Sequence, residues 1–407
     1  MSDNHHICGY GDVAAPDLHD GKNQIVLVFQ GGGALGAYQA GVYQALHEAG
    51  VEPDWVIGTS IGAINASIVA GNDADTRIER LQDFWSRVSH SSAFDLAFAA
   101  ASAFGNLLPN WTTVNLGVQG FFKPNPLAFL GQHVRLAPEA AGYYSTMPLR
   151  RTLEELVDFK RLGRAGPRLT VGAANVGTAQ MRYFDSRDEA IDVSHIMASG
   201  ALPPAFPAVR INGELYWDGG ILSNTPVEAV FDDFPRRSSI IFAVHVWNPD
   251  GAEPDSILQV MNRQKDLQYS SRAATHIRRQ AQLHRMRHAI SELVGLLPPD
   301  ALQRPDVQEI ASHGCLTRMH VVRLLSPQIN GEDHTKDIDF SKSGIRMRWE
   351  AGLRDARQAL AEQPWRSDVD PREGFYLHEL RRDRIDPAHL MDRTPTLVDD
   401  MQAAIER

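Results

Sequence analysis

Two strand–turn–helix units that follow each other within residues 24–71 constrain the fold of this chain more than any other feature. Residues 25–29 are a continuous apolar run, which is typical of a strand buried on both faces of a parallel sheet, and they lead into a glycine-rich turn at residues 31–36. A second apolar strand at residues 55–57 leads into another glycine-containing turn at residues 58–62, and helical periodicity follows each turn. A strand–helix–strand–helix opening predicts an α/β fold with a parallel sheet.

The second turn carries a candidate nucleophile. It reads Gly58-Thr59-Ser60-Ile61-Gly62, a G-x-S-x-G pattern at a strand-to-helix junction. Acyl transfer uses this geometry because the serine sits on a sharp turn, the flanking glycines avoid Cβ clashes, and the helix N-terminus stabilises developing negative charge. Ser60 is therefore the predicted nucleophile, with Gly58 and Gly62 as the glycines of its elbow. The pattern also suits a tight turn in which Ser60 only caps the helix.

The first turn is a candidate anion cradle. Gly31, Gly32 and Gly33 expose backbone N–H groups at a helix N-terminus, where an oxyanion or a nucleotide pyrophosphate could bind. The run also matches G-x-G-x-x-G through Gly36, the fingerprint of a dinucleotide-binding domain. Such a domain carries an acid at the end of its second strand, whereas here Asp54 lies at the start of that strand. The pattern therefore favours an oxyanion hole.

A serine nucleophile needs a base, and the residues alone offer more than one candidate. Asp218 precedes Gly219 and Gly220 in a turn after a predicted short strand, and we treat these three residues as an acid turn. His245 lies near the end of an apolar strand, and the order serine, aspartate, histidine would fit an α/β-hydrolase triad. His195 is a further histidine candidate. Both an Asp base and a His base remain open at this point.

Taken together, the glycine loop, the Gly58–Gly62 elbow and the acid turn resemble the patatin-like phospholipase family. Residues 198–207 and 224–227 resemble the family segments on either side of the acid, so the resemblance covers residues 24–230. It implies a three-layer α/β/α fold with a mostly parallel sheet and hydrolysis of fatty-acyl esters through an acyl-enzyme. In that scheme Ser60 and Asp218 form a catalytic dyad, the three loop glycines donate to the oxyanion, and no metal or cofactor takes part.

One position departs from the family pattern. Many members carry Lys or Arg where this chain has Leu35, and a cation there would help to hold a phosphate. We therefore expect an ester hydrolase acting on a neutral lipid, a simple carboxyl ester or a short hydroxyalkanoate oligoester rather than a phospholipase. The alternative is a binding or scaffold protein that keeps the patatin fold without turnover, which the intact Ser60, Asp218 and glycines argue against.

Composition divides the chain into segments. Residues 1–23 are polar and are expected to form a flexible leader, and residues 24–249 are the predicted acyl hydrolase domain. Within it, residues 93–131 are rich in Phe and Leu, and either pack on the core as a helical insertion or form a lid or acyl-chain wall. Residues 250–375 resemble an accessory domain of unknown function found in bacterial patatin-like proteins, and are expected to be mainly helical. Residues 376–407 form a charged tail.

The net charge and the local distribution of charge indicate which classes of partner the chain is expected to bind. The formal net charge of −10 disfavours whole-molecule attraction to nucleic acid. A predicted helix at residues 272–290 has no acidic residue, which is typical of a solvated or internally paired basic face and also of a face that contacts a membrane surface. The compatible partners are an acyl-ester or lipid substrate, a membrane contacted peripherally and a second copy of the chain. The arginines of this helix are Arg272, Arg278, Arg279, Arg285 and Arg287.

The chain is expected in the cytoplasm. Its two cysteines, Cys8 and Cys315, are far apart in the sequence, which favours a reducing compartment. The N-terminus lacks an apolar stretch behind a basic start, and no apolar stretch reaches the ~18 residues that span a bilayer. His5 and His6 have no Cys or carboxylate cluster beside them, so no metal site is expected.

Overall fold

The computed structural model describes residue 18 and residues 23–89, 117–130, 133–251, 253–329, 334–367, 369–370 and 373–380. Most of the predicted leader, residues 93–116 of the apolar insertion and the tail beyond residue 380 lie outside these ranges. None of the helices in the described ranges has both the length and the apolar character needed to cross a membrane.

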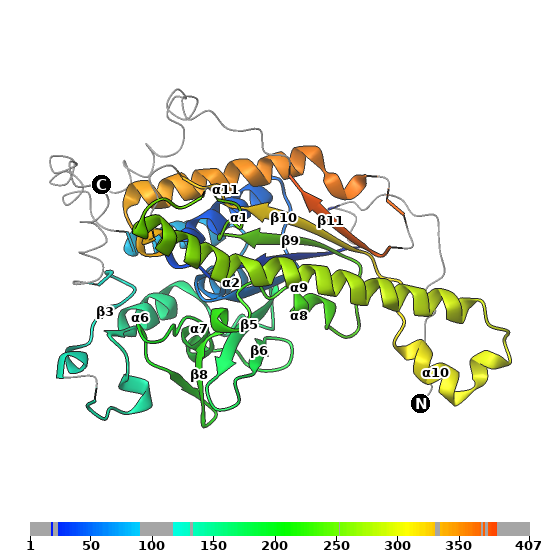
Figure 1. The fold of residues 1–407 in the computed structure, drawn as a ribbon, viewed down its shortest axis with the longest axis horizontal. Coiled ribbons are helices and arrows are strands. Elements are labelled where there is room, and N and C mark those ends of the chain that lie inside the picture. The colour runs from blue at the N-terminus through cyan, green and yellow to red at the C-terminus, as the bar shows by residue number, and fades with distance from the viewer. Residues whose placement is uncertain are drawn as a thin grey trace.

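A nine-stranded sheet forms the centre of the molecule (Figure 1). Its order is β11-β10-β9-β1-β2-β5-β8-β7, and β6 also pairs with β5. The pairs from β11 to β5 are parallel, whereas β5 pairs antiparallel with β6 and β8, and β7 with β8, so the sheet is mostly parallel as predicted. The strands are β1 Gln24–Phe29, β2 Trp55–Thr59, β5 Arg168–Asn175, β6 Met181–Asp185, β7 Val209–Ile211, β8 Glu214–Asp218, β9 Ser239–His245, β10 Met319–Leu325 and β11 Phe375–Glu379. A separate two-stranded antiparallel sheet consists of β3 Lys123–Pro124 and β4 Tyr144–Ser145.

Helices cover both faces of the sheet, which completes the predicted three layers. Every residue of β1, β2 and β9 is buried, because alternate side chains of each strand enter the core on opposite faces. The helices are α1 Ala37–Glu48, α2 Ile61–Ala70, α3 Arg77–Arg87, α6 Met147–Leu156, α7 Val193–Ser199, α8 Glu228–Phe231, α9 Ile257–Gly295, α10 Pro305–Ser312 and α11 Lys342–Glu362. Shorter 3-10 turns are η1 Gly33–Gly36, η3 Pro126–Leu130, η4 Pro138–Ala140, η5 Gly219–Ile221, η6 Ala301–Gln303, η7 Lys336–Ile338 and η8 Pro364–Arg366.

The mainly helical C-terminal region shares the central sheet. The strands β10 and β11 continue the sheet beyond β9, and the long α9 runs along one face of the sheet and extends beyond the ends of its strands (Figure 1). The helix α11 packs closely on α1, since a Cβ at Gly41 or at Gly352 would strike the backbone of the other helix. The boundary predicted at residues 249–250 therefore falls between strands that belong to one sheet.

Candidate active site

Ser60 lies on a strained turn between β2 and α2. Its backbone has φ 57° and ψ −126°, a conformation that residues with a side chain rarely adopt. Both flanking glycines are sterically required, because a Cβ at Gly58 would strike the backbone of Gly62 and a Cβ at Gly62 would strike the Phe29 carbonyl. Ser60 stands at the N-cap position of α2, but its side chain makes no capping hydrogen bond. Its hydroxyl is therefore not used as a helix cap.

A second serine holds this turn in place. The backbone N–H of Ser60 donates to the Ser199 hydroxyl oxygen at 2.9 Å, and that hydroxyl donates to the Gly172 carbonyl at 2.6 Å. Ser199 belongs to the segment at residues 198–207 that resembles the family, although its contact with the nucleophile turn could not be read from the sequence. The contact ties Ser60 to the neighbouring strand β5.

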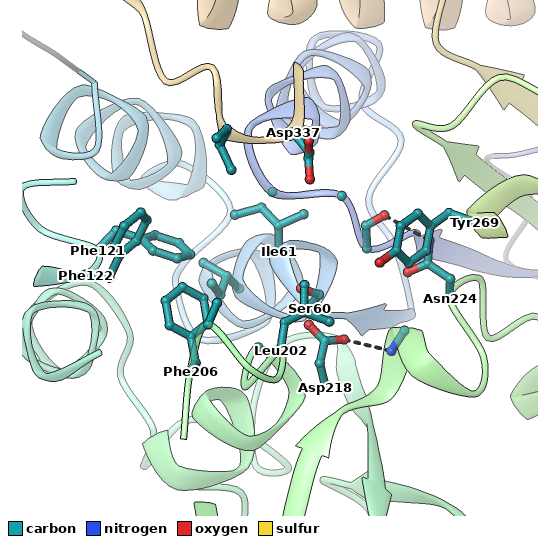
Figure 2. A pocket seen from close by; sticks show the side chains of 18 of the residues that line it. Ser60, Ile61, Phe121, Phe122, Leu202, Phe206, Asp218, Asn224, Tyr269 and Asp337 are labelled. Carbon is teal, nitrogen blue, oxygen red and sulfur yellow. Dashed lines mark hydrogen bonds between the residues drawn. The ribbon is translucent and has the colours of Figure 1, made fainter. Parts of the chain in front are cut away.

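Asp218 ends β8 beside Ser60 (Figure 2). Its side chain lines the same cavity as Ser60, and its Oδ1 accepts from the Gly220 backbone N–H at 2.7 Å. Only 2% of the residue is exposed. Burial raises the pKa of Asp218 to about 6, while the nearby Ser60 hydroxyl and the Gly220 N–H act in the opposite direction. A Cβ at Gly219 would lie 2.5 Å from the Gly172 carbonyl oxygen, so this half of the acid turn needs glycine to approach β5.

Neither histidine candidate reaches the nucleophile. His245 is buried in β9, its Nε2 has no hydrogen-bond partner within the described residues, and it is not among the residues that line the cavity at Ser60. Burial, aided by the positive charge of Arg323, lowers the pKa of His245 to about 3. The His195 ring belongs to the capping box of α7, where its Nδ1 lies 2.9 Å from Asp192. The structure thus brings Ser60 together with Asp218 and with neither of these histidines.

The three loop glycines line the same cavity as Ser60 and Asp218. The N–H of Gly31 donates to the Asn224 carbonyl at 3.1 Å, whereas within the described part of the chain the N–H groups of Gly32 and Gly33 have no acceptor. Gly33 has φ +56°, and a Cβ there would strike the carbonyl of Asp337. Two backbone donors are therefore left for a ligand on the wall that faces the serine.

The cavity has a volume of about 210 Å³ and an aromatic wall. Phe121, Phe122 and Phe206 stand on one side of Ser60, and Asn224 and Tyr269 stand on the other (Figure 2). The rings pack edge to face or tilted, with centroids 5.4 Å apart for Phe122 and Phe206. The described end of the apolar insertion at residues 93–131 supplies Phe121 and Phe122 to this wall. Further apolar lining residues are Ile61, Ile64, Tyr144, Leu202, Ala205, Ile338 and Phe340.

The charged lining of the cavity is acidic. Within the described residues, the side chains that line it include Asp218 and Asp337 but no Lys or Arg. Leu35 is only 3% exposed, packs in the hydrophobic core and does not line the cavity. An apolar residue at position 35 therefore does not shape the ligand space directly, and the lining residues give the better guide to ligand charge.

Two lysines approach the cavity, but each is paired. Lys265 lies 2.7 Å from Asp337, and Lys336 lies 2.6 Å from Asp266, so two consecutive residues of α9 bind two consecutive residues of η7. These contacts join segments about 70 residues apart, and nothing in the local sequence signals them. Within the described ranges, no group of three or more His, Cys, Asp or Glu side chains is arranged to hold a metal ion.

A serine on a strained strand–helix turn, a buried carboxylate beside it and a glycine loop with two N–H groups that have no acceptor in the described part of the chain form a site of the serine-hydrolase type in an α/β fold. The chain belongs to the patatin-like phospholipase family. The model of that family matches residues 27–231, and a second model, described as patatin phospholipase, matches residues 267–372.

Similar proteins are longer than the matched part of this chain. An uncharacterized NTE family protein of Mycobacterium tuberculosis is 28% identical over 208 residues, which are 51% of this chain and 28% of that protein. Lysophospholipase NTE1 of Yarrowia lipolytica is 27% identical over 233 residues, 56% of this chain and 13% of that protein. Patatin-like phospholipase domain-containing protein 6 of Homo sapiens is 38% identical over 85 residues, 20% of this chain and 6% of that protein. The chain thus matches less than a third of each relative's length.

The comparison with solved structures gives two bacterial proteins, both with low TM-scores. VipD from Legionella pneumophila is 15% identical with a TM-score of 0.32, over 81% of this chain and 67% of that chain. A chain of the ExoU–SpcU complex from the type III secretion system of Pseudomonas aeruginosa is 19% identical with a TM-score of 0.26, over 72% of this chain and 59% of that chain.

Proposed function

We propose that this protein is a serine acyl-ester hydrolase that uses Ser60 and Asp218 as a dyad. The observation that carries the proposal is that Ser60 and the buried Asp218 carboxylate lie beside each other in one cavity (Figure 2). The wall of this cavity also carries Gly32 and Gly33, whose N–H groups have no acceptor within the described residues. A nucleophile, a base and an oxyanion site then face one reacting carbonyl.

The proposed reaction has two halves. Ser60 Oγ bonds to the acyl carbon while Asp218 takes the hydroxyl proton, and the tetrahedral oxyanion is held by the loop donors. As the intermediate collapses, the alcohol leaves with the proton from Asp218, and the acyl group remains on Ser60. Water then attacks this acyl-enzyme and gives a proton to Asp218. That proton returns to Ser60 Oγ as the carboxylic acid leaves, which restores the free enzyme.

The C-terminal region is proposed to complete this site. Tyr269 of α9 lines the cavity, as do Asp337, Ile338 and Phe340 in or next to η7. The backbone of Asp337 also lies against Gly33 of the proposed oxyanion loop. We therefore assign to residues 250–375 the role of an active-site wall rather than that of an independent accessory domain.

The lining favours an uncharged ester with a short or medium acyl chain. A lining with acidic but no basic side chains does not attract a phosphate, so a carboxyl ester, neutral lipid or hydroxyalkanoate oligoester fits better than a phospholipid headgroup. An apolar cavity of ~150 Å³ holds benzene, so by proportion the cavity here accommodates roughly eight carbon atoms.

A panel of p-nitrophenyl esters from acetyl to palmitoyl tests the proposed activity and its chain length together. We expect kcat/KM to be greatest at or below the octanoyl ester and to fall at least about tenfold for palmitoyl, because an acyl chain too long for the cavity cannot bind with its ester carbonyl at Ser60. Phosphatidylcholine should be a poorer substrate than tributyrin. Ser60→Ala is the control and should remove all turnover above background. Turnover that persists without Ser60, or a preference for palmitoyl, would contradict the proposal.

The pH dependence of kcat/KM reports the proposed base. We expect activity to rise with a slope of one as Asp218 loses its proton, with a midpoint near pH 6, and then to level off. The sign follows from the mechanism, since only the ionised carboxylate can accept the Ser60 proton. A profile that stays flat down to about pH 4, where an ordinary aspartate titrates, would show that a buried Asp218 is not the base.

A further inference from the structure

The carbonyl of Gly31 receives two buried side-chain donors. The Trp247 indole Nε1–H donates to it at 2.8 Å, and the Asn224 amide Nδ2–H donates to it at 3.1 Å. Trp247 is 2% exposed and Asn224 is 5% exposed, so neither donor can exchange this partner freely for water. Both donors act on the peptide that links Gly31 to Gly32, inside the proposed oxyanion loop.

Fixing this carbonyl also fixes the next N–H group. A trans peptide is planar, so its C=O and N–H point in opposite directions. With the Gly31 oxygen held by Trp247 and Asn224, the Gly32 N–H is turned the other way, and within the described residues it has no acceptor. A loop of three glycines resists rotation of such a peptide poorly, because glycine accepts many backbone conformations. The two side-chain donors therefore provide the rigidity that the loop sequence lacks.

Trp247 is itself held firmly. Its ring stacks on Tyr269 with centroids 4.8 Å apart, and Lys336 Nζ lies 5.5 Å from the ring centroid. Its backbone N–H donates to Gln30 Oε1 at 3.0 Å, which links it to the residue immediately before the glycine loop. The indole thus sits in a site formed by the loop after β1, by α9 and by η7, and its N–H has a defined direction.

We propose that Trp247 is a positioning residue that sets the oxyanion hole by orienting the Gly31–Gly32 peptide. This inference rests on the proposed hydrolase function. An oxyanion donor lowers the barrier most when it needs no reorientation during the reaction, and the Trp247 hydrogen bond removes that need for the Gly32 N–H. Trp247 lies outside residues 27–231 that match the family model, so its role is not carried by the family motifs.

The test replaces Trp247 by Phe, which keeps a buried aromatic ring but removes the indole N–H. We expect kcat to fall about tenfold while KM stays within twofold of the wild type. The lost hydrogen bond orients a donor to the oxyanion, so its removal destabilises the transition state and leaves substrate binding unchanged. Affinity for a trifluoromethyl ketone, which forms a tetrahedral oxyanion adduct with the serine, should fall by a similar factor. A control ligand with the same chain, in which an ether oxygen replaces the ketone carbonyl, cannot form an oxyanion, and its affinity should not change. The midpoint of the pH–rate profile should not change either.

Trp55→Phe is the matched control. Trp55 is also buried and donates its indole N–H, at 2.7 Å to Thr170 Oγ1, but it does not line the cavity. Its replacement should lower stability without changing kcat. If the Trp247→Phe protein does not fold, 3-benzothienylalanine at position 247 keeps the ring shape and removes only the N–H.

The outcomes separate the two proposals. A variant at position 247 that keeps wild-type kcat and ketone affinity would overturn the positioning role alone, as would equal losses for the ketone and the ether. A wild-type protein without Ser60-dependent turnover would overturn the hydrolase function and the positioning role with it. A selective loss of ketone affinity at position 247, absent in Trp55→Phe, would support the proposal.

Discussion

Asp218→Asn should abolish turnover and, at pH 8, make the folded protein more stable than the wild type. Turnover is lost because an amide cannot accept the Ser60 proton, and we expect a decrease of at least about a thousandfold. Stability rises because the wild type must keep a carboxylate charge in a position that is 2% exposed. Asparagine retains a side-chain oxygen for the Gly220 N–H without carrying that charge.

The direction of this stability effect follows from the pH at which Asp218 ionises in the folded and in the unfolded protein. Below pH 4, Asp218 is protonated in both the folded and the unfolded protein, so its ionisation makes no difference to stability. Between pH 4 and pH 6 the unfolded chain ionises first, because burial raises the folded-state pKa of Asp218 to about 6. The wild type therefore loses stability across this window and does not regain it at higher pH. At about 1.4 kcal/mol for each pH unit between the two pKa values, the loss is on the order of 3 kcal/mol.

Urea denaturation of wild type and Asp218→Asn at pH 4 and at pH 8 measures this effect. The two proteins should have similar unfolding free energies at pH 4 and should separate at pH 8, with the variant the more stable. The exposed Asp300→Asn controls for the general loss of one negative charge and should follow the wild type at both pH values. Equal stability of Asp218→Asn and wild type at pH 8 would show that burial does not penalise this carboxylate.

Lys336→Met should destabilise the protein by ~3–5 kcal/mol, the range for breaking a buried ion pair from one side. The side chains of Lys336 and Asp266 are only 6% and 4% exposed, so removal of the lysine leaves a buried carboxylate without its cation. The adjacent pair, Lys265 with Asp337, is 34% and 21% exposed, and solvent screens it more. Lys265→Met is therefore the matched control and should cost ~1 kcal/mol or less.

A double-mutant cycle isolates the coupling between the buried pair. Lys336→Met combined with Asp266→Leu should recover most of the stability lost in either single variant, because neither charge then remains buried alone. Unfolding free energies from chemical denaturation provide the measurement. If Lys336→Met and Lys265→Met cost the same small amount, burial does not distinguish the two pairs. Because Asp337 and Ile338 line the cavity, Lys336→Met should also raise KM in the ester assay.

Local chemistry allowed the first half of the site to be predicted from the sequence. The apolar runs at residues 25–29 and 55–57 are the strands β1 and β2, and the two glycine-containing turns follow them. Strand burial and steric freedom at glycine act over a few residues, so their patterns can be read without knowledge of the remaining chain. The steric need for Gly58 is of this kind, since its Cβ would strike Gly62 in the same turn, whereas Gly62 must be glycine because the Phe29 carbonyl of β1 lies against it.

Features that depend on long-range register could not be predicted in this way. Chain order left both Asp218 and His245 in contention, because the distance of each from Ser60 depends on how β8 and β9 are placed in the sheet. Trp247 and Asp337 carry no local signal, since each meets the glycine loop across more than 200 residues of chain. The sequence position of Leu35 beside the glycine loop suggested that its side chain would influence phosphate binding. The 3-10 turn η1 instead places that side chain in the core.

The pairing of β9 with β10 in one sheet limits how the two halves of this protein can evolve separately. A chain that ended at residue 249 would leave β9 with an open hydrogen-bonding edge, and every residue of that strand is buried in this structure. Exposed apolar edges of this kind template aggregation. The segments matched by the two family models are therefore expected to be gained, lost and exchanged during evolution as one unit, even though the sequence divides them into two.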